Sequence, residues 1–347
     1  MLKLDKLLKT VNQYKASDLL LEAGAKPCLR INGDIVAIKD HPVLTREATE
    51  EYIFELLSDK QKQLFDSGED LDFSVSVPEI ANFRVNVFKQ RNGIGGVFRL
   101  IAADIPKFEE LGLPQAIRQI VDMNSGLVLV TGPTGCGKST TLASIINEIN
   151  QKYPKHIITI EDPVEYIHKP ARSIINQREV GPHCKNFAQA LRSSLRESPD
   201  VILVGEMRDL ETISLAITAA ETGHLVLSTV HTSGTAKTIS RIVDVFPSDQ
   251  QNQIKAQLAE ILKAIIWQRL VKTADSKSQV PAVEFMLQNH ATANLIRKGA
   301  THQIDTVIET SRNEGMQTMK RSLLELATTG KITKEEAMKY LPMEFED

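Results

Sequence analysis

Hydrophobic positions change their spacing partway along the chain. In the first part, short segments alternate apolar and polar side chains, as in the strand that carries Phe83, Val85 and Val87 on one face. This alternation predicts half-buried strands in a mostly antiparallel sheet. Later, continuous apolar runs of strand length alternate with helical patterns, which predicts a largely parallel sheet covered on both faces. We therefore expect an α/β protein in which a smaller α+β domain, residues 1–103, precedes a domain of residues 104–287.

Helical spacing of apolar side chains marks the other elements. An amphipathic helix is expected at residues 1–11, and a long helix is expected from 250 to 270. Helices also account for residues 288–347, which we expect to extend the second domain. The segment 102–106, Ala-Ala-Asp-Ile-Pro, is the expected linker between the two domains.

Composition limits the possible functions. The chain has 347 residues, 42% of them hydrophobic, and a net charge of −3, so it has no general attraction to nucleic acid or to anionic lipid. Its apolar runs are shorter than the roughly 18 residues that span a bilayer, so no direct membrane insertion is expected. The three cysteines are widely spaced, which fits a reducing cytoplasm and excludes a paired-cysteine zinc module.

A glycine-rich segment carries the strongest chemical signal. It matches the phosphate loop G-x-x-x-x-G-K-[ST], with an apolar strand before it and a helix after it. Glycines let successive N–H groups point at a phosphate chain, the lysine reaches the β- and γ-phosphates, and the serine hydroxyl binds Mg²⁺. We therefore expect ATP and Mg²⁺ to bind at Gly132, Pro133, Thr134, Gly135, Cys136, Gly137, Lys138, Ser139 and Thr140.

Cys136 has two interpretations. A helix N-terminus and Lys138 would both stabilise the thiolate, so the thiol is expected to have a lowered pKa and to be more reactive. The favoured alternative is a small side chain whose backbone N–H does the binding.

Acidic residues follow two of the predicted strands. Glu161, Asp162 and Glu165 follow the strand at 156–160, where ligands bind in open α/β sheets. Glu206 follows a four-residue apolar strand, and its position predicts a ligand of the Mg²⁺ ion beside Ser139.

Three further polar residues have weaker signals. Asp209 precedes a helix and is expected to cap it. His224 and His231 lie at opposite ends of one strand and cannot share a metal. His231 at the C-terminal end either touches the γ-phosphate region or is a structural histidine; spacing alone leaves both open.

These motifs together resemble a known family. In order and spacing they are similar to the secretion ATPase superfamily of type II secretion and type IV pilus motors, and the segments that carry the resemblance are the phosphate loop, 160–165, 204–212 and 223–232. Two later segments, Asp-Val-Phe-Pro at 244–247 and Gly-Met-Gln-Thr at 315–318, resemble the twitching-motility retraction ATPases. The resemblance covers nearly the whole chain.

The resemblance implies a specific machine. It implies a PAS-like N-terminal domain followed by a RecA-like ATPase domain with a helical C-terminal end. It also implies a homohexameric ring in the cytoplasm that hydrolyses ATP to retract pili. Such a ring would be held at the inner membrane by the pilus machine, and it would contact the platform protein of that machine.

The resemblance also implies roles for individual residues. Glu165 corresponds to the general base, Glu206 to the Mg²⁺-associated acid and His231 to a sensor of the nucleotide. Two N-terminal arginines correspond to residues that close over the phosphates: Arg84 and Arg99. Three later arginines match positions implicated in nucleotide contact or subunit coupling: Arg192, Arg196 and Arg208.

The chain departs from the family pattern at two places. Asn82 stands where the family usually has an arginine, and Ala293 replaces the first arginine of a helix motif tied to productive retraction. The second departure leaves open whether the protein is a main retraction motor or an accessory paralogue.

Three other functions fit the sequence less well. A pilus-assembly or type II secretion ATPase normally adds a longer N-terminal region and a four-cysteine zinc module. A RecA-like nucleic-acid motor is disfavoured by the 5% aromatic content and the negative charge. A nucleotide-binding scaffold without turnover is disfavoured by the presence of Lys138, Glu165 and Glu206.

Overall fold

The computed structural model describes residues 4–31, 33–78, 80–101 and 105–341. The chain separates into two compact units, the first formed by residues up to Asp104 together with Pro163–Ile167, and the second by the rest. The expected boundary between 103 and 104 lies outside the described residues, as do the first three residues of the expected linker.

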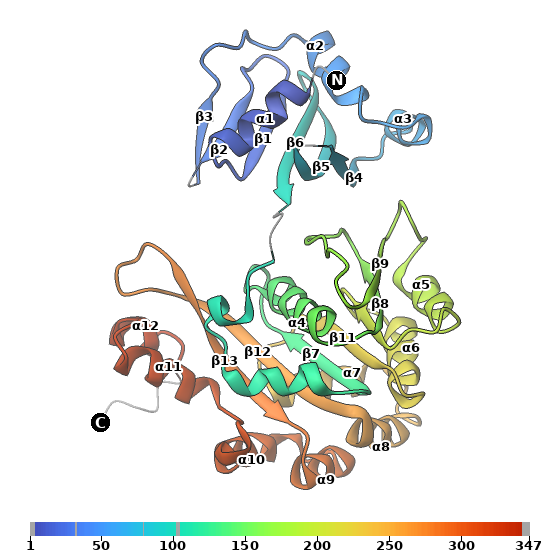
Figure 1. Ribbon diagram of the computed structural model, residues 1–347, viewed down its shortest axis with the longest axis vertical. Coiled ribbons are helices and arrows are strands. Elements are labelled where there is room, and N and C mark those ends of the chain that lie inside the picture. The colour runs from blue at the N-terminus through green and yellow to red at the C-terminus, as the bar shows by residue number, and fades with distance from the viewer. Residues whose placement is uncertain (1–3, 32, 79, 102–104, 342–347) are drawn as a thin grey trace. The chain divides into compact units, whose positions relative to one another are not determined.

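The first unit is built on a six-stranded antiparallel sheet, in the order β3-β2-β1-β6-β5-β4 (Figure 1). This confirms the α+β prediction for the N-terminal part. Its strands are β1 (Asp18–Glu22), β2 (Cys28–Ile31), β3 (Asp34–Ala37), β4 (Leu71–Val77), β5 (Ala81–Gln90) and β6 (Gly93–Ile101). Its helices are α1 (Asp5–Gln13), α2 (Arg46–Phe54) and α3 (Asp59–Asp66).

The two faces of this sheet differ as the alternation predicts. Phe83, Val85 and Val87 are fully buried and form one core with leucines of α1 and with Ile53 and Phe65 of the other two helices. The opposite face carries polar side chains. α3 was not predicted, although Ser58 begins it with a capping box.

The second unit is built on a seven-stranded sheet, in the order β13-β12-β7-β11-β10-β8-β9. All neighbours are parallel except β12 and β13. The strands are β7 (Gly126–Thr131), β8 (His156–Glu161), β9 (Ile174–Glu179), β10 (Val201–Val204), β11 (Leu225–Val230), β12 (Leu262–Lys272) and β13 (Gln279–Leu287). The predicted, largely parallel sheet is confirmed.

Helices cover both faces of this sheet (Figure 1). The connection from β7 to β8 runs in one direction along the strand order, and those from β9 to β10 and from β10 to β11 run back. Right-handed crossovers therefore put α4 on one face and the next two helices on the other. These three helices are α4 (Lys138–Lys152), α5 (Phe187–Ser194) and α6 (Leu210–Glu221). The unit also contains α7 (Thr235–Asp244), which follows β11, and short 3₁₀ segments at Phe108–Leu111 and Gln115–Asp122.

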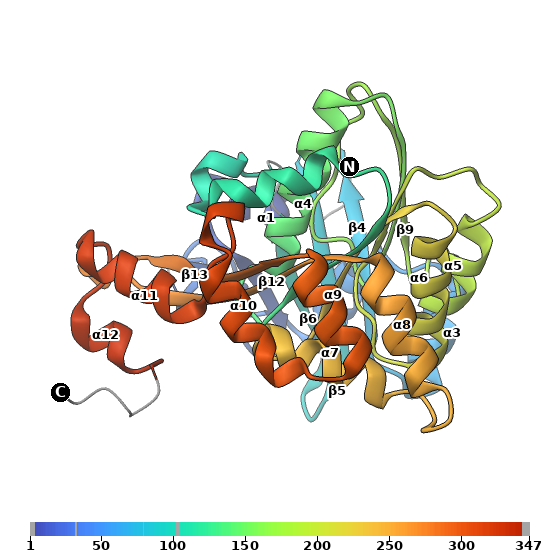
Figure 2. The same ribbon diagram turned by 90° about the horizontal axis from the view of Figure 1, so that it is seen from below.

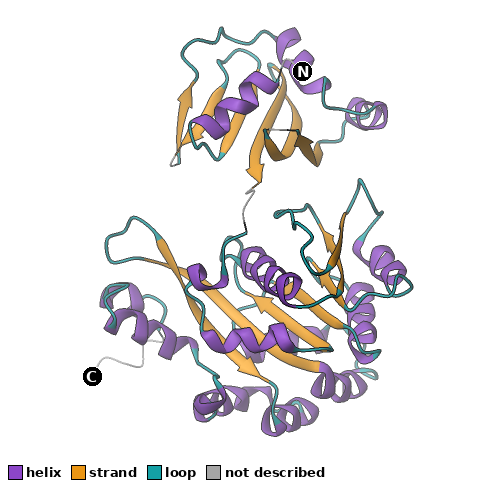
Figure 3. Ribbon diagram, viewed as in Figure 1, coloured by secondary structure: helices purple, strands orange, loops and turns teal. Residues whose placement is uncertain are grey.

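The prediction of one long helix at 250–270 is wrong for the second half of that segment. α8 (Gln251–Ile261) ends where β12 begins, and Figure 3 shows the change from helix to strand. The apolar stripe of α8 runs directly into Ala264, Ile265 and Ile266, all fully buried. Because β12 lies between two strands and is covered on both faces, its apolar run has no alternation that would distinguish it from a helix.

The C-terminal part is helical, as predicted. α9 (His290–Lys298) lies beside α8, as Figures 1 and 2 both show. α11 (Met319–Thr328) packs against β13, and it follows α10 (Ile304–Thr310) and precedes α12 (Lys334–Met338). Within the part of the chain that the structure describes, no helix is long and apolar enough to cross a membrane.

Candidate nucleotide site

The phosphate loop connects β7 to α4, as its motif predicts. Gly132, Gly135 and Gly137 have φ values of +142°, +75° and +88°, which disfavour any other residue. A Cβ on Gly132 would lie 2.3 Å from the backbone oxygen of Gln268, whereas a Cβ on Gly135 would meet nothing within 4 Å. The loop is therefore packed closely on its strand side and open at Gly135.

Lys138 lies inside this loop. Its side chain is buried, and Nζ donates hydrogen bonds of 3.0 Å to the carbonyl oxygens of both Gly132 and Pro133. Ser139 and Thr140 follow in the first turn of α4 and are partly exposed. Backbone N–H groups of the loop, the positive end of a helix dipole and an ammonium group thus meet at one place, which fits the phosphate chain of ATP.

The structure overturns the idea of a lowered pKa at Cys136. The side chain is 2% exposed, and burial raises the pKa of its thiol although Lys138 and backbone N–H groups act in the opposite direction. Burial disfavours the thiolate more than these groups stabilise it. The interpretation of Cys136 as a small packing side chain is the one that the geometry supports.

Strand order brings three predicted segments to one edge of the sheet. β11 lies between β7 and β10, and all three are parallel. Thr131, which ends β7, pairs with Val230, which ends β11, so the phosphate loop and His231 leave the sheet side by side. Glu206 follows β10 on the other side of β11.

Glu206, Arg208 and His231 form one cluster at this edge. Arg208 Nε lies 2.7 Å from Glu206 Oε1, and His231 Nε2 lies 3.5 Å from the same oxygen. The Glu206 side chain is 19% exposed and that of Arg208 is 77% exposed. The hydrogen bond to the carboxylate raises the pKa of Arg208 further above its usual value.

The backbone under this cluster is fixed by β11. Ser228 Oγ donates to the Val204 carbonyl at 2.7 Å, and Thr229 Oγ1 donates to the Gly205 carbonyl at 2.6 Å. The Met207 N–H donates back to the Thr229 carbonyl at 3.1 Å. Asp209 then caps α6 by accepting from the Thr212 N–H, as predicted.

The acidic segment after β8 has a support that the sequence did not reveal. Gln177 on β9 donates to Glu161 Oε1 at 3.2 Å and accepts from the His168 N–H at 2.8 Å, so it connects both sides of this segment. Glu165 is exposed and lies in Pro163–Ile167, which groups with the first unit. Its role as general base stays a prediction.

Arg192 and Arg196 do not join the Glu206 cluster. Arg192 Nη2 lies 2.7 Å from Glu211 Oε1, and both side chains are more than half exposed. A helix over 187–197 is predicted from the sequence, with these two arginines four residues apart on one face. α5 ends at Ser194, so Arg196 lies beyond the helix and that prediction is wrong. Leu195 begins the turn that leads to Pro199, and α5 therefore ends earlier than the sequence predicts.

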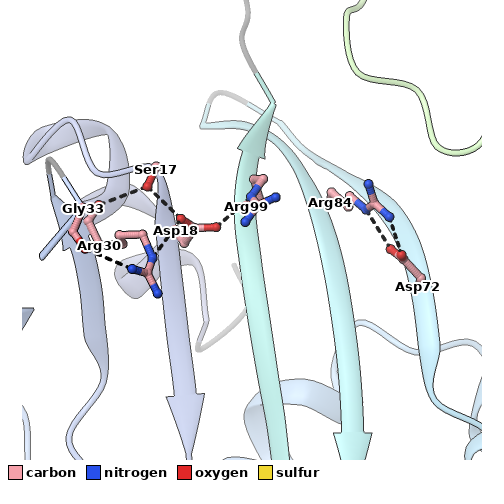
Figure 4. A network of polar contacts seen from close by, with 7 residues as sticks. All are labelled: Ser17, Asp18, Arg30, Gly33, Asp72, Arg84 and Arg99. Carbon is pink, nitrogen blue, oxygen red and sulfur yellow. Dashed lines mark hydrogen bonds and ion pairs between the residues drawn. The ribbon is translucent and has the colours of Figure 1, made fainter. Parts of the chain in front are cut away.

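The two N-terminal arginines lie in one row across the antiparallel sheet (Figure 4). Arg84 contacts Asp72 through two bonds, of 3.1 Å and 2.6 Å. Arg99 Nε lies 2.8 Å from Asp18 Oδ1, and Arg30 Nε lies 3.6 Å from Oδ2 of the same buried carboxylate. Their predicted roles at the phosphates stay predictions.

Comparisons with known proteins agree with this architecture. The family model for "Type II/IV secretion system protein" matches residues 2–339. The chain is 47% identical over 311 residues to a twitching motility protein of Neisseria gonorrhoeae, covering 90% of this chain and 83% of that protein. It is 46% identical over 322 residues to the type IV pilus retraction ATPase PilT of Pseudomonas aeruginosa, covering 93% of each.

A solved structure extends the likeness to the fold. The crystal structure of the pilus retraction motor PilT with bound ADP is 46% identical in sequence, covers 99% of this chain and 98% of its own, and superimposes with a TM-score of 0.93. Both units therefore have the fold of that motor.

Proposed function

We propose, since the chain belongs to the type II/IV secretion system protein family, that it is an ATP-hydrolysing motor that retracts type IV pili. The observation that carries the proposal is the meeting of the phosphate loop with Glu206 and His231 at one edge of the sheet. Relatives that are 46–47% identical over most of the chain supply the biological context.

ATP would bind through the phosphate loop. The N–H groups of Gly132–Thr140 and the α4 terminus would surround the phosphates, and Lys138 would turn from the Gly132 and Pro133 carbonyls to the β- and γ-phosphates. Ser139 and Glu206 would hold Mg²⁺, directly or through water. Bound Mg²⁺ would neutralise charge that develops as the terminal phosphoryl group is transferred.

Hydrolysis would use acidic residues that follow β8 and β10 in the chain. Glu165 would accept the proton of the attacking water, and His231 would respond to the γ-phosphate through its contact with Glu206. Arg84, Arg99, Arg192, Arg196 and Arg208 remain candidates for stabilising charge or for coupling subunits. An arginine finger contributes about 10³ to 10⁵ in rate, so any of them that acts this way dominates turnover.

The working form would be a homohexameric ring in the cytoplasm. It would bind a pilus platform protein and thereby be held at the inner membrane, without inserting into the bilayer. If arginines from a neighbouring subunit complete the site, isolated subunits hydrolyse ATP poorly. A monomeric preparation with full turnover would contradict that part of the proposal.

An assembly or secretion ATPase would share the same motor and is the main alternative. Two relatives that this chain matches over 83% and 93% of their length are a twitching motility protein and a retraction ATPase, which favours retraction. Ala293 on α9 keeps open whether the protein is the main motor or an accessory paralogue. Ala293→Arg distinguishes them, because only an accessory protein should gain retraction from the restored side chain.

Phosphate release by the purified full-length chain tests the enzymatic part of the proposal. Wild type should hydrolyse ATP in a Mg²⁺-dependent reaction, and Lys138→Ala should lower turnover at least 10²-fold because the γ-phosphate loses its ammonium partner. Lys277→Ala removes an exposed lysine of the β12–β13 hairpin and serves as the matched control. Equal turnover in wild type and Lys138→Ala would refute the proposed site.

A further inference from the structure

Gln268 on β12 contacts the phosphate loop from the neighbouring strand. Its side chain is 1% exposed, and its Nε2 donates a 2.7 Å hydrogen bond to the carbonyl oxygen of Cys136. Its Oε1 accepts a 2.9 Å bond from the hydroxyl of Thr141 in α4. We infer that Gln268 is a positioning residue that sets the direction of the loop's N–H groups, an inference that rests on the proposed function.

The geometry of one peptide bond gives this contact its effect. In a trans peptide the C=O and the following N–H point in opposite directions. The Cys136 carbonyl is held towards Gln268, so the Gly137 N–H is turned away from β12 and into the loop. Gly137 also has a positive φ, which permits many alternative orientations unless a neighbour selects one.

Thr141 determines which end of the Gln268 amide faces the loop. Its hydroxyl donates to Oε1, which leaves the NH₂ group for the Cys136 carbonyl. Gln268 thus connects the loop to the first turns of α4 through two bonds. The same residue limits the loop through its backbone, because its carbonyl oxygen lies where a Cβ of Gly132 would be.

Burial makes these bonds costly to lose. Without the Gln268 amide, the Cys136 carbonyl and the Thr141 hydroxyl would be left unpaired in the interior, and the 136–137 peptide would be free to rotate. A misdirected N–H group would weaken phosphate binding in the ground state and the transition state equally. Such a loss raises KM and Kd and leaves kcat nearly unchanged.

Gln268→Met is the direct test, because it keeps volume and removes both bonds. We expect the Kd and KM for Mg·ATP to rise about tenfold, the loss expected for one to two hydrogen bonds, with kcat within about threefold of wild type. Thr141→Val, which removes one anchor of the amide, should give a smaller rise of the same kind. A role in folding alone would instead lower the melting temperature without nucleotide and leave Kd unchanged.

Gln268→Glu distinguishes the effect of losing the hydrogen-bond donor to the Cys136 carbonyl from the effect of altered packing. A buried carboxyl is protonated over a wider pH range than usual, and its O–H can replace the amide donor to the Cys136 carbonyl. Affinity relative to wild type should therefore be nearly restored at pH 6 and lost at pH 9, where a carboxylate would face that carbonyl. Gln268→Met should be weak at both pH values.

The outcomes separate this inference from the proposed function. Wild type that binds and hydrolyses ATP, together with wild-type Kd and KM in Gln268→Met, would overturn the inference alone. A pH-independent Gln268→Glu that behaves like Gln268→Met would also overturn it, because packing and not the donor would then be responsible. Wild type that binds no nucleotide would overturn the proposed function and this inference together.

Discussion

The guanidinium of Arg208 contacts the carboxylate of Glu206 at 2.7 Å, although the two side chains differ greatly in exposure. Arg208 is mostly in solvent, so this contact is readily exchanged, whereas Glu206 is held at the sheet edge by the backbone bonds to β11. Exposed ion pairs contribute about 1 kcal/mol or less to stability. We infer that Arg208 leaves Glu206 available for a Mg²⁺ ion at little energetic cost.

Glu206→Gln should uncouple binding from turnover. The amide keeps the shape of the side chain but removes the charge that would hold the ion, so kcat should fall about 10²-fold or more while ATP still binds. Phosphate release and nucleotide titration on the same preparation measure the two effects. Arg208→Ala is the comparison, because it removes the ion-pair partner of Glu206 and leaves the carboxylate in place. Wild-type turnover in Glu206→Gln would exclude a role for Glu206 as a ligand of the metal ion.

Arg84 allows a test that separates a structural from a catalytic role. Its bonds to Asp72 are partly exposed, so Arg84→Ala should cost less than about 1 kcal/mol of stability. Asp72→Asn weakens the same pair but keeps the arginine. If Arg84 acts at the phosphates, Arg84→Ala should lower ATP turnover strongly and Asp72→Asn should not; equal effects in both variants would mean that Arg84 only holds Asp72.

The Cys136 thiol should react slowly. Because burial raises its pKa, the thiolate fraction at neutral pH is below that of an ordinary cysteine, and alkylation should accelerate only as the pH rises into the alkaline range. Mass spectrometry after iodoacetamide treatment at pH 7 and pH 9 measures the rate at each cysteine. Rapid modification of Cys136 at pH 7 would contradict the buried geometry, and Cys136→Ala provides the control for activity.

His168 should make the fold sensitive to acid. Burial lowers its pKa to about 4, against an ordinary value near 6.5, so between these values the unfolded chain binds a proton that the folded chain excludes. The contribution of His168 to the free energy of unfolding is fully present above about pH 6.5 and decreases as the pH falls towards 4. At pH 5 the free energy of unfolding is lower by about 2 kcal/mol than at neutral pH.

His168→Leu tests this sign. The main-chain bond from residue 168 to Gln177 is retained in the variant, since it uses the backbone N–H. The difference in melting temperature between pH 7.5 and pH 5 should therefore be about 3 °C smaller in the variant than in wild type. An identical difference in both proteins would show that His168 is not kept neutral by burial.

The sequence predicted the parts of the site that depend on local chemistry. The phosphate loop is recognisable because its glycines, lysine and serine must lie at fixed spacing between a strand and a helix, and the structure has both. Glu206 and His231 were found because each follows a short apolar strand, and parallel strands place such residues at one edge.

The contacts that were missed depend on tertiary structure. The sequence predicts helix where β12 lies, because a strand buried on both faces has no alternation, and it therefore predicts Gln268 on a helix. Gln177 was missed because nothing in an edge strand indicates which polar side chain turns inwards. The sequence predicts Arg196 on the same helix as Arg192, but α5 ends at Ser194, one residue before the last apolar position, Leu195.

Twitching motility in a strain that lacks the gene tests the central claim most directly. Expression of wild type should restore the twitching zone, and Glu206→Gln, expressed to the same level, should not, because retraction requires ATP hydrolysis by this chain. Normal twitching in the deletion strain, or full restoration by Glu206→Gln, would contradict the account.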